Sequence, residues 1–196
     1  DAENKPFAEP LRTLAETYYQ LGEWEQGSRA ARRSANGFAE RVGQENQKEY
    51  AKSRLIGANC DFRLFVDARQ PEIDGGTPDM NGIVPPEPRT TALARIAAAG
   101  YGEARIDFPA IATNQTAAIE LFLGQNGDAI STYERGLINH PYETAIHDAY
   151  IDWMCKIGQE DALVGAYRRF VREKADAPIL RWFQARAIYR NADRLR

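Results

Sequence analysis

A repeat of 34 residues in the C-terminal half constrains the fold of this chain more than any other feature of its sequence. Three pairs of residues share this separation: Gly124 and Gly158, Ile130 and Val164, and Tyr133 and Tyr167. The length suits a pair of helices, with glycine at the turn and tyrosine packing from the second helix onto the first. Helix pairs of this kind bury a shared apolar face when they stack. The sequence therefore predicts an all-α fold of stacked antiparallel helix hairpins, an α-solenoid.

The composition fits a globular chain and excludes several other classes. The chain has 196 residues, of which 43% are hydrophobic and 27% charged, so it is neither wholly disordered nor collagen-like. No apolar run approaches the roughly 18 residues of a membrane-spanning helix, and we expect no membrane partner. Two cysteines, Cys60 and Cys155, cannot build a disulfide-rich scaffold or a four-cysteine zinc site. The net charge of −3 gives no overall nucleic-acid-binding signature.

Helical periodicity also marks the N-terminal part of the chain. One helical face is formed by Leu11, Leu14, Ala15 and Tyr18. Gly22 interrupts this pattern, and a second face follows with small residues where two helices can approach: Trp24, Gly27, Ala31 and Ser34. A third helical stretch is expected from residue 44 to residue 69. Residues 1–69 are thus predicted to form a helical hairpin plus an extra helix.

Between residues 70 and 89 the composition changes to proline and glycine. Five prolines and three glycines fall in this stretch: Pro71, Pro78, Pro85, Pro86 and Pro88, with Gly75, Gly76 and Gly82. Proline removes an amide donor and glycine adds backbone freedom, so a long irregular loop is predicted over 70–89. A short helix is expected from Thr90 to Ala99, stopped by Gly100 and Gly102, and a new helix is expected to begin at Pro109. Residues 90–196 form the predicted repeat region.

The repeat region resembles the tetratricopeptide repeat family, whose period is also about 34 residues. The clearest unit, 110–143, has residues at the family's turn, small, aromatic, small and terminal proline positions: Gly124, Ala129, Tyr133, Gly136 and Pro141. The next unit carries Tyr150, Gly158, Leu163 and Tyr167, but Leu163 and Phe170 replace small residues and Ala175 replaces the proline. A last helix, about 177–192, would cap the final hydrophobic face. The resemblance implies a protein-interaction scaffold.

A narrower resemblance covers about residues 127–183. The order of its residues is similar to that of the bacterial transcriptional activator domain, as in His140-Pro141-Tyr142-Glu143, followed by His147 and by Tyr167-Arg168-Arg169. That domain consists of tetratricopeptide-like helix pairs and follows a winged-helix DNA-binding domain, for which residues 1–125 lack the strands. The resemblance implies a regulatory or oligomerisation domain, with nucleic acid contacted only through a domain outside this chain.

No residue pattern points to catalysis, a metal or a cofactor. His140 and His147 are seven residues apart, whereas metal-binding helices favour a separation of four, so both are interpreted as structural histidines. Cys155 lies in an apolar helical run and is interpreted as a small buried hydrophobe, as is Cys60. The loop 77–82 has a glycine placed as in a calcium loop, but Thr77 and Pro88 occupy the terminal ligand positions.

Charge and position indicate the candidate partner-binding residues. From residue 160 to residue 196 there are nine lysines and arginines and five acidic residues. Arg168, Arg169 and Arg172 share one side of a helix and are candidates for binding an acidic partner, against the alternative of a solvated helix surface. Asn114 and His147 are candidates because polar residues on the first helix of each pair often face the peptide groove of such arrays.

The sequence therefore predicts a non-enzymatic scaffold that binds a protein or peptide, without a cofactor. Three alternatives remain open: the regulatory part of a transcriptional activator, a helical fragment of an enzyme whose catalytic half is missing, and an exported scaffold. A homo-oligomer also remains open. We expect a cytoplasmic protein unless a leader was removed before Asp1, where the sequence begins without methionine.

Overall fold

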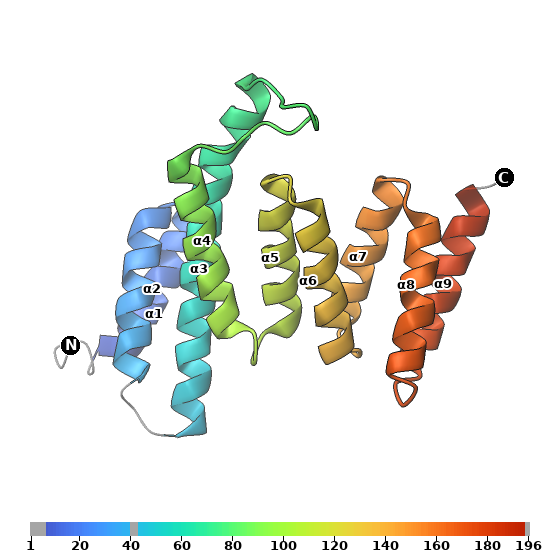
Figure 1. The fold of residues 1–196 in the computed structure, drawn as a ribbon. Coiled ribbons are helices and arrows are strands. Elements are labelled where there is room, and N and C mark those ends of the chain that lie inside the picture. Colours follow the sequence, from blue (N-terminus) through green and yellow to red (C-terminus); the bar gives the residue numbers. More distant parts are fainter. Residues whose placement is uncertain (1–6, 40–42, 195–196) are drawn as a thin grey trace. The chain divides into compact units, whose positions relative to one another are not determined.

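The structure, a computed structural model, describes residues 7–39 and 43–194. These residues form nine α-helices and no strand, which confirms the predicted all-α class (Figure 1). The chain divides into two compact units. Unit 1 comprises residues 1–108 and 118–125, and unit 2 comprises residues 109–117 and 126–196, so that helix α5 (Pro109–Phe122) contributes to both.

Unit 1 contains α1 (Ala8–Leu21), α2 (Trp24–Ala39), α3 (Gln44–Gly75) and α4 (Pro88–Ala104). Gly22 ends α1 in the left-handed conformation, with φ of 78°, and its N–H donates to the carbonyls of Tyr18 and Tyr19. Glycine reaches this conformation without the steric cost of a Cβ, so the turn predicted at Gly22 is confirmed. Along α3, Gly57 and Ala58 face α2 and α4 respectively, where small residues let the helices pack closely.

Three predicted helix boundaries in unit 1 are wrong. Helix α3 continues past residue 69, through Pro71, to Gly75, and α4 begins at Pro88, so the irregular segment covers only 76–87. Helix α4 also passes through Gly100 and Gly102 to Ala104 instead of ending at residue 99. Gly100 is buried against α3, where a Cβ would lie 2.9 Å from the Cβ of Ala58. The glycine therefore serves close helix packing and does not end the helix.

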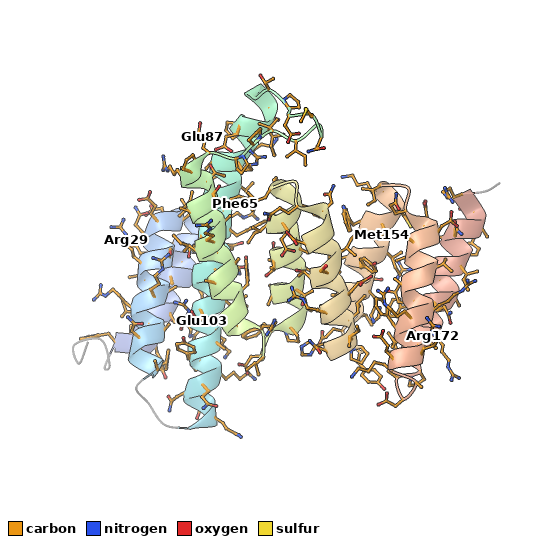
Figure 2. All side chains as sticks on the ribbon, viewed as in Figure 1. Arg29, Phe65, Glu87, Glu103, Met154 and Arg172 are labelled. Carbon is orange, nitrogen blue, oxygen red and sulfur yellow. The ribbon has the colours of Figure 1, made fainter. Side chains whose placement is uncertain are left out.

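A buried ion pair holds the end of α3 and the irregular segment together. The guanidinium of Arg69 donates to Glu72 at 2.8 Å, to the carbonyl of Phe122 at 2.9 Å and to the carbonyl of Val84. Glu72 also accepts a hydrogen bond from the hydroxyl of Thr90 on α4. Figure 2 places Glu87 where the segment rejoins the helices. These contacts favour a helix through Pro71 despite the hydrogen bond that proline removes.

Unit 2 contains the first part of α5, followed by α6 (Asn126–Asn139), α7 (Thr144–Lys156), α8 (Glu160–Glu173) and α9 (Ile179–Arg194). Pro109 occupies the first turn of α5, as predicted. The turn glycines of the repeat behave as expected, because Gly124 and Gly158 have φ of 75° and 69°. Gly136 lies so close to α5 that a Cβ would come within 2.6 Å of Cγ2 of Thr113.

Aromatic rings fill the interior of unit 2. Tyr133 on α6 and Tyr167 on α8, the aromatic positions of the repeat, are 5% and 0% exposed. Tyr150 on α7 lies between them, with ring centroids 5.5 Å from Tyr133 and 6.5 Å from Tyr167. The packing of Tyr167 onto the preceding helix is therefore as predicted. The same layer continues to Phe183 on α9, 6.3 Å from Tyr167, so α9 closes the interior.

Candidate interaction surface

His147 lies inside unit 2 and has no exposed surface. Its Nε2 is 2.9 Å from the carbonyl oxygen of Pro141, and its Nδ1 is 2.8 Å from the hydroxyl of Tyr167. A carbonyl only accepts hydrogen bonds, so Nε2 carries the proton and Nδ1 accepts from Tyr167. Burial lowers the pKa of His147 below its ordinary value of 6.5. The residue is structural, and no part of its ring is open to a partner.

Asn114, the other candidate predicted on the first helix of a pair, links two helices of unit 2. Its Nδ2 donates to the carbonyl of Ala145 at 3.1 Å, which ties α5 to the start of α7. The side chain is half-buried. Asn114 and His147 thus both contact neighbours within unit 2, and His147 is fully buried there.

The three candidate arginines of α8 divide into one paired and two free residues. Arg169 contacts a carboxylate oxygen of Glu134 on α6 at 2.6 Å, and its guanidinium lies 5.3 Å from the ring centroid of Phe170. Arg168 and Arg172 are exposed, and the structure shows no ion pair for either within the described residues. Arg172 lies near the C-terminal end of α8 (Figure 2). Two of the predicted cations are therefore available to a partner.

The neighbouring helix, α9, is apolar on two sides. Its inner side carries Leu180, Phe183 and Ala187, which are at most 1% exposed. Its outer side carries the residues that we call the outer face of α9: Trp182, Ala185, Ile188, Tyr189 and Ala192. Trp182 is 60% exposed, Ile188 45% and Tyr189 67%. A surface helix normally presents polar residues to solvent, so this face is unusual.

The capping role of α9 was predicted from the sequence, whereas its exposed outer face was not. Phe183 and Leu180 cover the aromatic interior, as expected of a capping helix. A capping helix ordinarily has a polar outer side, because nothing packs on it. Trp182, Ala185, Tyr189 and Ala192 follow a spacing of three, four and three residues, which places them on one helical face. That spacing is visible in the sequence and could have revealed the face.

Charged groups surround the outer face of α9 unevenly. Near the start of α9 lie Arg172 and Arg181, which are both exposed. Near its end lies Asp161 of α8, which accepts hydrogen bonds from Asn191 at 2.7 Å and Arg194 at 3.0 Å. The Asp161 side chain is still 77% exposed. The start of α9 is therefore basic, whereas Asp161 near its end is neutralised within the chain by Arg194.

A hollow in unit 1 is the main alternative site. It has a volume of about 670 Å³, lies on the outside of α3 near its end, and is lined by Val66, Asp67, Gln70, Pro71, Asp74 and Gly75. The amide of Gln70 donates to Asp74 at 2.8 Å, and both side chains are exposed. The hollow is wide open to solvent, and two of its polar side chains contact each other. Its lining points to a ligand less specifically than the exposed aromatic residues of the outer face of α9 do.

Neither cysteine has the environment of a reactive thiolate. Burial raises the pKa of Cys60 to about 12, and it also raises the pKa of the half-buried Cys155.

Within residues 7–39 and 43–194, no three His, Cys, Asp or Glu side chains lie close enough to hold a metal ion. In the same part of the chain, no helix combines the length and apolar character needed to cross a membrane.

Comparisons with known proteins leave the family undetermined. No family model matches the chain. No curated protein and no solved structure is similar to it at a significant level.

Proposed function

We propose that this chain is a non-enzymatic helical-repeat protein that binds another polypeptide through the outer face of α9. The carrying observation is that Trp182 and Tyr189, seven residues apart, are exposed on one face of a helix whose opposite side is already buried, with Ile188 exposed at the edge of that face. Clustered exposed apolar side chains on a folded domain mark interaction sites, whereas single exposed apolar residues do not. Tryptophan and tyrosine are also the residues that contribute most at the centres of protein interfaces.

The repeat supports this proposal independently. Glycine turns and buried tyrosines recur at the 34-residue spacing, which is consistent with the tetratricopeptide-like array that the sequence resembles. Arrays of stacked helix pairs use their extended surfaces for binding proteins and peptides. The exposed Arg168 and Arg172 on the neighbouring helix α8 would help to guide association and partner choice.

Comparative capture from the native cell extract tests the proposed function. The complete chain is compared with Trp182→Glu/Tyr189→Glu and with Leu21→Glu, a matched control at an apolar position that is 66% exposed in unit 1. We expect the same bound polypeptide with the wild type and the control, and at least tenfold less with the α9 variant. Equal recovery with all three chains, or no specific polypeptide with any of them, would reject the proposal.

A further inference from the structure

We infer that the polypeptide bound by the outer face of α9 is an acidic segment, whose apolar side chains cover Trp182 and Tyr189 and whose carboxylates pair with arginines at the start of α9. The inference rests on the proposed function and names the chemistry of the partner of that surface. It is carried by the ion pairs of α8 and α9, which neutralise most of the acidic side chains around this face and leave an excess of unpaired cations.

Five acidic side chains around α8 and α9 are already neutralised by arginines of the same two helices. Three arginines make these contacts: Arg169 with Glu134 and Glu173, Arg186 with Asp148, and Arg194 with Glu160 and Asp161. A basic partner would have to compete with these arginines for the carboxylates. The surface therefore offers little attraction to a positively charged polypeptide.

Other cations of the α8–α9 hairpin have no ion pair among the described residues. They are Arg168 and Arg172 on α8, Lys174 in the connection, and Arg181 and Arg190 on α9. Between residues 160 and 194, the acidic side chains without an ion pair of this kind are Asp176 and Asp193. Five unpaired cations against two unpaired anions leave an excess of three positive charges in this part of the chain. The surface therefore attracts an anionic partner.

Unpaired cations lie beside Trp182, at the start of α9. Asp161 at the start of α8 contacts Arg194 at the end of α9, so the two helices run antiparallel and the end of α8 lies next to the start of α9. Arg172 is the last residue but one of α8, and Figure 2 places it at this end. Arg181 directly precedes Trp182 in the sequence. A segment that covers Trp182 therefore brings its neighbouring side chains close to Arg172 and Arg181, where carboxylates form charge-assisted hydrogen bonds with guanidinium groups.

A nucleic acid is also anionic, but it fits this surface less well than an acidic polypeptide does. Its phosphates recur along the whole strand, whereas here the excess charge lies at one end of the outer face of α9, because Asp193 balances Arg190 near the other end. Between those ends, Ala185 and Ile188 are aliphatic and suit apolar side chains. The chain also carries a net charge of −3, which opposes a long polyanion.

Selection from a phage library of random peptides tests the chemistry of the partner. The complete chain is the bait, and Trp182→Glu/Tyr189→Glu removes the peptides that bind elsewhere. We expect the peptides that need Trp182 and Tyr189 to combine apolar side chains with an excess of Asp and Glu over Lys and Arg. Peptides that need both residues but carry no acidic excess would overturn the inference and leave the proposed function standing.

Fluorescence anisotropy of a selected acidic peptide tests the arginines. Arg172→Glu/Arg181→Glu should raise its Kd at least tenfold. Arg63→Glu/Arg95→Glu, the same change of charge at two exposed positions of unit 1, should leave the Kd nearly unchanged. Thermal unfolding shows that each variant is folded. Equal weakening by both pairs of substitutions would show that only the overall charge matters, and would overturn the inference.

Salt and a second probe separate the remaining outcomes. Raising the salt concentration from about 0.05 M to about 0.5 M should weaken the binding of the acidic peptide several-fold, because salt screens exposed charges. A Kd that does not change with salt would overturn the inference. So would a single-stranded oligonucleotide of the same net charge that binds more tightly than the peptide. A library without any peptide that needs Trp182 and Tyr189 would also overturn it, and the capture experiment then decides separately whether the proposed function stands.

Discussion

The ring of Phe183 lies flat against the ring of His147, with centroids 3.8 Å apart and planes only 6° from parallel. Phe183 comes from α9 and His147 from α7, so this contact attaches α9 to the interior of unit 2. The histidine is neutral because burial lowers its pKa, so Nε2 donates to Pro141 and Nδ1 accepts from Tyr167. Protonation would place a charge in this buried site and require the hydroxyl of Tyr167 to accept instead of donate.

The stability of the chain should therefore fall in mild acid. Burial lowers the pKa of His147 in the folded state, so the unfolded state binds more protons below pH about 6.5. The free energy of unfolding should decrease from pH 6.5 down to the lowered pKa, and His147 should add no further slope below it. One proton limits the slope to about 1.4 kcal/mol per pH unit. Urea unfolding between pH 4.5 and 7.5, spanning the ordinary histidine pKa, measures this.

His147→Gln supplies the control for this pH dependence. Glutamine keeps a donor and an acceptor but does not titrate, so the variant should be less stable at pH 7.5 and should show a smaller decrease in stability toward acid. His140→Gln, at a histidine that is only partly buried, controls for the exchange of histidine for glutamine as such. Parallel curves for the wild type and His147→Gln would contradict the neutral, buried state of His147.

The packing of α4 on α3 should depend on the absence of a side chain at Gly100. A Cβ there would lie 2.9 Å from the Cβ of Ala58, so Gly100→Ala should destabilise the protein by about 1–3 kcal/mol. Gly102 lies on the same helix with nothing within 4 Å of its Cβ position. Gly102→Ala should stabilise the protein by about 0.5 kcal/mol, through helix propensity. Thermal and urea unfolding of both variants measure the difference.

A double-mutant cycle identifies the clash as the cause. Ala58→Gly removes the atom that the new methyl group of Gly100→Ala would meet. The two substitutions together should cost clearly less than the sum of their separate costs. Strict additivity would show that Gly100 acts through backbone entropy alone, and would contradict the close approach of α3 and α4.

The Arg69–Glu72 pair should determine whether the segment 76–87 stays in place. The side chains are 2% and 13% exposed, and hydrogen bonds from Thr90 and Arg69 lower the pKa of Glu72 in spite of its burial. Arg69→Ala would leave Glu72 without its cation and the carbonyls of Val84 and Phe122 without their donor. Truncating one partner of a buried pair costs about 3–5 kcal/mol. We expect a loss of this size in urea unfolding.

The same variant should loosen the segment locally. Hydrogen exchange of amides 76–87 should accelerate in Arg69→Ala, whereas amides in unit 2 should exchange as in the wild type. Arg69→Met/Glu72→Leu, which replaces the pair by apolar residues of similar volume, should recover much of the lost stability. Unchanged exchange in segment 76–87 of Arg69→Ala would show that the pair does not hold it.

The two cysteines should differ in reactivity. Cys60 is buried with its pKa raised to about 12, and Cys155 is half-buried. A disulfide reagent at pH 8 should therefore modify Cys155 first in the native protein, and Cys60 only as fast as the chain opens. Peptide mass analysis after timed quenching gives both rates. Equal rates in the folded protein, with both thiols reacting as in urea, would contradict the burial of Cys60.

Much of the local helical structure could be predicted from the sequence. The turns at Gly22, Gly124 and Gly158 were predictable because a helix hairpin needs a left-handed residue, which glycine adopts readily. The buried tyrosines followed from the repeat. The limits of the irregular segment could not be predicted, because α3 passes Pro71 through contacts of Arg69 and Glu72 that are distant in sequence.

The candidate surface was predictable only in part. Arg168 and Arg172 are exposed as expected. Arg169 is engaged by Glu134, and His147 is covered by Phe183, and both contacts depend on how helices pack and not on local pattern. The outer face of α9 was present in the spacing of its apolar residues. A single sequence does not show which of the two apolar sides of a helix is left uncovered.

Oxidative footprinting tests most directly whether the outer face of α9 binds a polypeptide. The complete chain is exposed to hydroxyl radicals alone and in complex with the polypeptide that it captures from the cell extract, and oxidation of Trp182 and Tyr189 is compared with that of the fully exposed Met80 in unit 1. Binding through α9 should lower the oxidation of Trp182 and Tyr189 in the complex, while Met80 is oxidised at an unchanged rate. Unchanged oxidation of all three residues in the complex would contradict this account.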